Sequence, residues 1–217
     1  MARTFNGTNQ SISMASVPLS PNDAVISLAA WIKTSSTAGV VFASDNGSSA
    51  RFCQFKVISS KLSLILFAAG GTARTWTGTS NVNTGAWVHV GCSYDGTTGI
   101  LYVNGVGEGS AALSATIGSD ARNWRFGAQI AGVSQSFFTG PIAHGAMWKR
   151  ALAAAEFKSL ADGLLPSHLA PDHYWPLWGT DSPEPDIGTV AKVAGTLDNN
   201  PVFASGSPTS MELLTLG

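Results

Sequence analysis

A chain of 217 residues is long enough for one large domain, and its 44% hydrophobic residues supply the material of a core. Charged residues make up only 12%, and 12 Lys and Arg against 13 Asp and Glu leave a net charge of −1. No basic field is therefore present to hold nucleic acid or anionic lipid, and no apolar run reaches the about 18 residues of a membrane span.

The N-terminal stretch MARTFNGTNQSISM has no apolar segment behind a basic one. It therefore predicts that the protein has no signal peptide and stays in the cytoplasm in which it is made. The two cysteines, Cys53 and Cys92, fall at apolar positions of predicted strands. In a reducing compartment we expect both to be buried free thiols.

Strand patterns fill the first two thirds of the chain. Apolar and polar residues alternate, or β-branched and aromatic residues run together, and Gly, Asn, Asp or Ser separate the runs. The predicted strands are 3–6, 9–14, 25–34, 39–44, 51–57, 61–68, 71–77, 87–95, 98–104, 106–112, 124–129 and 138–149. A series of this kind predicts an all-β sandwich or jelly roll of two antiparallel sheets.

One short helix and an extended tail follow the strands. ALAAAEFKSLADG predicts a helix over about 152–162 that ends at Gly163. Prolines are frequent from Pro166 onward, and proline donates no hydrogen bond to a sheet. The sequence therefore divides into a β-domain over 1–165 and a Pro-rich tail over 166–217, which wraps the same domain or packs on a neighbour.

The C-terminal stretch NNPVFASGSPTSMELLTLG carries apolar side chains that are costly to leave in water. We therefore expect it to dock on this protein or on a neighbour. The predicted contact residues are Val202, Phe203, Leu213, Leu214 and Leu216.

Two long motifs resemble one known family. WVHVGCSYDGTTGILYVNG (87–105) resembles the central hairpin of laminin-G-like and pentraxin domains, which belong to the concanavalin A-like lectin/glucanase superfamily. FTGPIAHGAMWKRALAAAEFKSL (138–160) resembles the strand and helix that follow it in that family. RTFNGTNQSISM and ISLAAWIKTSS are similar to the opening strands. The resemblance covers roughly 3–160 and implies a concanavalin A-like jelly roll, in which the hairpin is scaffold.

Catalytic chemistry is not indicated. Glycosidases of this superfamily place paired carboxylates about 5 Å apart on one strand, and none of the four Glu lies in such a pattern. No Gly-x-Ser-x-Gly elbow or phosphate-binding Gly loop occurs, and the four His fit no usual zinc spacing. The sequence therefore predicts a protein that is not an enzyme and has no catalytic residues.

The resemblance to pentraxins also raises the question of calcium. Asp45 and Asn46 are similar to the Asp-Asn pair that opens the pentraxin site, and Gln129 stands in the partner loop. Ala128 and Ala131 occupy positions where the family has acids. One carboxylate and two amides would hold calcium poorly, so we predict no metal site and no cofactor.

Carbohydrate binding without a metal requires an aromatic platform and converging polar groups. Arg74 and Trp76, in ARTWTG, are the candidates, with Asp45, Asn46 and Gln129 beside them. The alternative for Trp76 is a place in the core or in an interface, where most tryptophans lie.

Two functions fit these observations. The first is a virion structural protein for capsid decoration or a tail fibre, because the tail resembles that of phage-encoded laminin-G-like proteins and the low charge suits extensive protein contacts. Its partners would be other virion proteins and copies of itself, assembled in the host cytoplasm, with host surface glycans as a further ligand. The alternative is a lectin-like module that binds carbohydrate. Neither function involves nucleic acid or a membrane.

Overall fold

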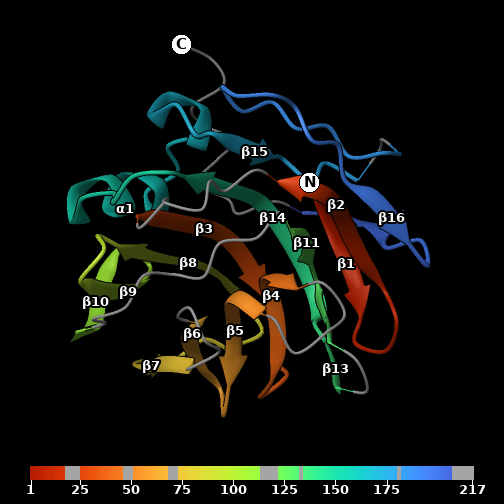
Figure 1. Ribbon diagram of the computed structural model, residues 1–217. Coiled ribbons are helices and arrows are strands. Elements are labelled where there is room, and N and C mark those ends of the chain that lie inside the picture. Colours follow the sequence, from red (N-terminus) through yellow and green to blue (C-terminus); the bar gives the residue numbers. More distant parts are fainter. Residues whose placement is uncertain are drawn as a thin grey trace.

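The computed structural model describes residues 1–17, 25–45, 51–67, 73–112, 122–131, 134–179 and 182–206. In this part of the chain two large antiparallel sheets lie face to face, with a small third sheet beside them (Figure 1). The predicted all-β sandwich with one short α-helix is confirmed.

The first large sheet has eight strands. Its order is β10 (Val106–Ala112), β9 (Thr98–Val103), β8 (Trp87–Tyr94), β3 (Ile26–Lys33), β14 (Thr139–Trp148), β1 (Ala2–Asn6) and β17 (Val202–Ala204), and β15 (His173–Trp175) also pairs with β14.

The second large sheet has seven strands. Its order is β16 (Thr196–Asp198), β2 (Ser11–Val17), β11 (Arg122–Phe126), β4 (Gly39–Asp45), β5 (Arg51–Ile58), β6 (Lys61–Phe67) and β7 (Ala73–Asn81). The third sheet is the hairpin of β12 (Ala128–Ala131) and β13 (Ser134–Phe137).

The predicted strand 124–129 is in fact two strands, because the chain turns at Gly127. This glycine has a φ of +77°, a conformation that residues with a Cβ rarely adopt. A Cβ there would also lie 2.3 Å from the ring of Phe5. The turn separates β11 from β12 and so allows β12 and β13 to form their own hairpin.

Aromatic side chains fill the space between the two large sheets. Phe42 stacks on Phe126 with ring centroids 4.2 Å apart, and Trp124 lies 4.7 Å from Phe42. Trp175, from the predicted tail, packs edge-on against the same pair. Because large rings bury much apolar surface, this cluster stabilises the contact between the sheets and fixes the tail to it.

The helix α1 (Ala154–Ala161) covers the outer face of the eight-stranded sheet, slightly shorter than its predicted range. Phe157 and Leu160 are buried there, and Phe157 stacks on Tyr102 with centroids 4.1 Å apart. The backbone N–H of Ala153 donates to the carboxylate of Glu156, which satisfies one free amide at the helix start.

The described part of the predicted tail packs on the same sandwich and adds strands to both sheets. A 3-10 helix (Pro166–Leu169) leads into β15, and β16 and β17 then pair with β2 and β1. The buried guanidinium of Arg3 donates to the carboxylate of Glu184 at 2.5 Å. His173 and Asp186, both fully buried, are bonded at 2.7 Å. The first pair joins Glu184 of the tail to β1, and the second joins β15 to Asp186 within the tail.

A carboxylate joins the free edges of the two sheets. Glu108 lies on β10, the last strand of one sheet, and accepts hydrogen bonds from the backbone and hydroxyls of Thr79 and Ser80 on β7, the last strand of the other. Partial burial raises its pKa, but these four bonds outweigh burial and lower the pKa to about 2. Glu108 therefore closes this edge of the sandwich in its ionised form.

Candidate functional site

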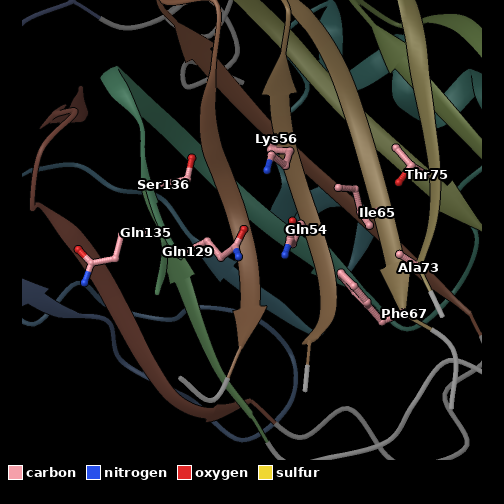
Figure 2. A pocket seen from close by; sticks show the side chains of 9 residues that line it. All are labelled: Gln54, Lys56, Ile65, Phe67, Ala73, Thr75, Gln129, Gln135 and Ser136. Carbon is pink, nitrogen blue, oxygen red and sulfur yellow. The ribbon is translucent and has the colours of Figure 1, made fainter. Parts of the chain in front are cut away.

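A cleft of about 390 Å³ lies on the outer face of the seven-stranded sheet, between strands β5–β7 and the β12–β13 hairpin (Figure 2). Its volume falls within the range of roughly 300–1,000 Å³ that is usual for small-molecule sites. The lining residues are Gln54, Lys56, Ile65, Phe67, Ala73, Thr75, Gln129, Gln135 and Ser136.

Strand alternation explains why polar side chains reach this face. Successive side chains of a strand point to opposite faces of its sheet. On β5, Cys53, Phe55 and Val57 point inward and belong to the core, so Gln54 and Lys56 point outward into the cleft.

Strands β6 and β7 continue the same face. Leu64 and Leu66 of β6 lie in the core, which turns Ile65 and Phe67 toward the cleft. On β7, Thr75 is exposed and lines the cleft. The side of the cleft formed by the large sheet is thus polar on β5 and apolar on β6, and β7 contributes one polar and one small apolar residue, Thr75 and Ala73.

The β12–β13 hairpin supplies the opposite wall. Gln129 on β12 pairs with Ser136 on β13, and Gln135 precedes Ser136 on the same strand. Gln129 is buried, whereas Gln135 is exposed at the rim. The turn at Gly127 ends β11 and starts the hairpin, and so it determines where this wall lies.

The floor of the cleft contains an unsatisfied donor. Gln54 is only 2% exposed, and in the described part of the chain its Nε2 has no hydrogen-bond partner. A buried amide without a partner costs roughly 1–3 kcal/mol, so such groups are rare and call for a physical reason. The terminal torsion of Gln is broad, so a small rotation of the amide can present Nε2 to a ligand oxygen.

The chemistry of the lining suits a polar ligand. Amides, hydroxyls and an ammonium group can donate and accept hydrogen bonds, and Phe67 and Ile65 offer apolar surface. No carboxylate, histidine or cysteine is among the described lining residues.

The structure brings one of the five predicted ligand residues, Gln129, into the cleft. Arg74 is exposed on β7, but it is not among the residues that line the cleft. Asp45 is the last residue of β4, where its backbone pairs with Arg51, and its side chain lies outside the described part of the structure. Asn46 lies outside the described residues altogether.

Trp76 does not form a binding platform, because its side chain points between the sheets. It is 7% exposed and belongs to the core. Its ring covers Gly99 on β9 of the opposite sheet, where a Cβ would lie 1.7 Å from the indole. Trp76 is therefore a core residue, which was the alternative that the sequence left open. The aromatic side chain in the cleft is Phe67 instead.

Sequence reasoning missed most of the lining residues, including Gln54, Lys56 and Phe67. A signal for two of them was present: in RFCQFKV, Gln54 and Lys56 are the polar positions of an alternating strand, and so had to face outward. Nothing in the sequence indicated that Gln135 and Ser136 would lie over that face.

Three histidines, His89, His144 and His173, are buried in the domain. Burial lowers the pKa of His89 to about 3, and burial together with the nearby N-terminus lowers that of His144 to about 4. His144 is bonded through Nδ1 to the hydroxyl of Tyr174, and His173 is bonded to Asp186. In the described ranges, no group of three or more His, Cys, Asp or Glu could hold a metal ion.

Both cysteines are free and fully buried on facing sheets. Burial raises the pKa of Cys92 to about 12, and burial with the neighbouring Cys92 raises that of Cys53 well above its ordinary value.

The helices in the described part of the chain are too short or too polar to span a membrane.

Two of the predicted partner-contact residues, Val202 and Phe203, lie on the edge strand β17 and are about half exposed. The other three, Leu213, Leu214 and Leu216, lie outside the described residues.

Comparison with known proteins places this fold in a family. The family model of the concanavalin A-like lectin/glucanases superfamily matches residues 6–158. The chain belongs to this family, and its domain is laminin G-like. A search of curated proteins finds no match.

Solved structures share the fold at low sequence identity. A proposed carbohydrate-binding protein from Bacteroides ovatus is 19% identical with a TM-score of 0.68, and the match covers 91% of this chain but only 58% of that one. The heptameric SAP-like pentraxin of Limulus polyphemus is 16% identical, with a TM-score of 0.61 and coverage of 74% and 81%. Domain 4 of the extracellular arabinanase AbnA from Geobacillus stearothermophilus, solved with arabinotriose, is 19% identical, with a TM-score of 0.56 and coverage of 74% and 76%.

Proposed function

We propose that this member of the concanavalin A-like lectin/glucanases superfamily binds carbohydrate in the cleft between strands β5–β7 and the β12–β13 hairpin. The observation that carries the proposal is the amide of Gln54, a buried donor without a partner at the floor of a polar cleft. A ligand that offers an oxygen to this donor removes the cost of leaving it unsatisfied.

The lining suits a saccharide better than it suits an apolar ligand. Sugars present many hydroxyls that both donate and accept, and the amides of Gln54, Gln129 and Gln135 do the same. Phe67 and Ile65 supply apolar surface for the C–H face of a ring. The cleft volume of about 390 Å³ is near the small end of the usual range, which fits a short saccharide rather than a long chain.

Relatives support the same reading. One solved structure with this fold is a proposed carbohydrate-binding protein, and another is an arabinanase domain solved with arabinotriose. Identities below 20% show only the fold, so the cleft of this chain carries the proposal. The arabinanase domain shows that a protein with this fold can bind carbohydrate.

The test is a screen of immobilised glycans, followed by calorimetric titration of those that bind. We expect Gln54→Leu to reduce the affinity for any such glycan about tenfold or more, because the substitution removes a donor and keeps the volume. Gln10→Leu is the matched control, since Gln10 lies outside the cleft. A glycan bound equally by both variants, or no bound glycan at all, would overturn the proposal.

A protein contact is a second candidate function, favoured by the half-exposed Val202 and Phe203 on edge strand β17. The role as a virion structural protein stays a prediction. Light scattering tests the contact itself: we expect an oligomer that the double variant Val202→Ser with Phe203→Ser converts to a monomer. A wild-type protein that is already monomeric contradicts it.

A further inference from the structure

We infer that the saccharide bound in the cleft is an N-acetylated amino sugar, and that its acetamido group occupies the floor of the cleft at Gln54. This inference rests on the proposed function and adds the chemical class of the ligand. The neighbours of Gln54 in the sheet carry it, because they place a polar amide between two hydrocarbon side chains.

Strand register gives these neighbours. Gln54 on β5 pairs with Ala43 on β4 and with Ile65 on β6. Directly paired residues of adjacent antiparallel strands lie on the same face of a sheet, with Cβ atoms about 4.5–5.5 Å apart. Ala43 is fully buried, and Ile65 lines the cleft beside Gln54 (Figure 2). A ligand group that reaches the amide of Gln54 therefore also meets apolar surface.

An acetamido group has both of the parts that this floor needs. Its carbonyl oxygen can accept a hydrogen bond from the Nε2 of Gln54, which is buried and has no partner in the described structure. Its methyl group can pack on Ile65, which removes apolar surface from water on both sides. One small substituent thus satisfies the donor and covers the hydrocarbon beside it.

The N–H of the acetamido group has an acceptor on the opposite wall. Gln129 on the β12–β13 hairpin is buried and lines the cleft together with Gln54 (Figure 2). The amide oxygen of Gln129 can accept a hydrogen bond. In a trans amide the C=O and the N–H point in opposite directions, so an acetamido group between Gln54 and Gln129 can bond to both walls at once.

A hydroxyl in place of the acetamido group fits this floor less well. It can accept the hydrogen bond from Gln54, but it has no hydrocarbon part to cover Ile65. Its O–H also starts from the accepting atom itself, so it is not directed across the cleft as the amide N–H is. The floor therefore favours N-acetylated sugars over sugars that carry a hydroxyl at the same position.

The experiment compares matched ligands by calorimetric titration. Three pairs consist of glucose, galactose and mannose, each with its N-acetylated 2-amino counterpart. We expect one N-acetylated sugar to bind about tenfold more tightly than its hydroxyl partner, because it gains a hydrogen bond and the burial of a methyl group. The preference should persist at high salt, since the group that is recognised is neutral.

Four variants assign the preference to the floor of the cleft. Gln54→Leu should abolish the difference between N-acetylated and hydroxyl sugars, while Gln10→Leu, outside the cleft, should keep it. Ile65→Thr, which shortens the hydrocarbon and keeps the branched Cβ, should reduce the difference severalfold. Its matched control is Ile187→Thr, at an exposed position outside the cleft. Circular dichroism checks that all four variants fold.

The outcomes separate this inference from the proposed function. Equal binding of N-acetylated and hydroxyl sugars, or a preference that survives in Gln54→Leu, overturns this inference and leaves the proposed function standing. A glycan screen in which no bound glycan carries an N-acetyl group does the same. Binding of no saccharide in the titrations or in the screen overturns both.

Discussion

Replacing Gln54 by Leu should make the protein more stable while it loses its ligand. The Nε2 of Gln54 is buried and has no hydrogen-bond partner in the described structure, so the folded state carries its desolvation cost. Leu has a similar volume and no polar atom, and its neighbours inside the cleft include the apolar Phe67 and Ile65. The substitution therefore removes a desolvation cost that destabilises the folded state and adds a small amount of apolar burial that stabilises it.

The size of the effect follows from that cost. An amide buried without a partner costs about 1–3 kcal/mol, and the change from an unbranched to a branched side chain of similar volume costs less than about 1.5 kcal/mol. The net gain in the free energy of unfolding is thus about 1 kcal/mol. For a domain of this size, 1 kcal/mol raises the Tm by about 2–4 °C.

Urea unfolding at neutral pH, followed by tryptophan fluorescence, measures this gain as a shift of the midpoint at unchanged slope. Gln10→Leu is the control with the opposite sign, because the Nε2 of Gln10 donates to the carbonyls of Asn199 and Asn200 at 3.1 and 3.0 Å. A loss of more than about 1 kcal/mol in Gln54→Leu would refute the reasoning, since it would show that the amide is satisfied in the folded protein.

Three further predictions concern stability and reactivity. Glu108→Gln should lower the free energy of unfolding by about 1–2 kcal/mol at neutral pH, a value discounted for the partial exposure of Glu108. The pKa of Glu108 in the folded protein, about 2, lies below the ordinary 4.5. Calorimetry should therefore show that the difference from wild type shrinks as the pH falls from 4.5 toward 2 and vanishes below pH 2. The pKa values of His89 and His144 are lowered from 6.5 to about 3 and about 4, so both histidines bind protons more readily in the unfolded protein. Their contribution to stability should therefore be full above pH 6.5, and below it the free energy of unfolding should fall by up to about 1.4 kcal/mol per pH unit for each histidine. Urea midpoints that stay constant from pH 7 to pH 5 would contradict this. Cys53 and Cys92 should resist iodoacetamide in the folded protein and react in urea, as mass spectrometry would show, and rapid labelling of the native protein would contradict their burial.

The sandwich was predictable because alternation is a local property. In RFCQFKV, for example, the apolar positions fix which side of the strand is buried, whatever the strand pairs with. The helix was predictable for a similar reason, since Ala, Leu, Glu and Lys favour a helix and Gly163 ends it. The tail was harder: its prolines indicated irregular chain, yet it contributes β15, β16 and β17, because pairing with strands already in place outweighs weak local preference.

Trp76 shows where local pattern fails. Residues on both sides of it in ARTWTG are polar or small, so the local pattern does not indicate which way the ring points. The absence of a side chain at Gly99, on the opposite sheet, leaves the space that the indole fills. Gln129 was placed in the candidate site, but its true neighbours Gln54 and Phe67 were not foreseen.

The sequence by itself determined an all-β sandwich, its single α-helix and the side of β5 on which Gln54 and Lys56 lie. Only the tertiary structure decided that a hairpin near residue 130 stands over that face and makes a cleft of it. The physical reason is range: side-chain alternation is set by each strand's own backbone, whereas a cleft depends on which distant segments pair and pack, and those contacts are fixed only when the whole core is assembled.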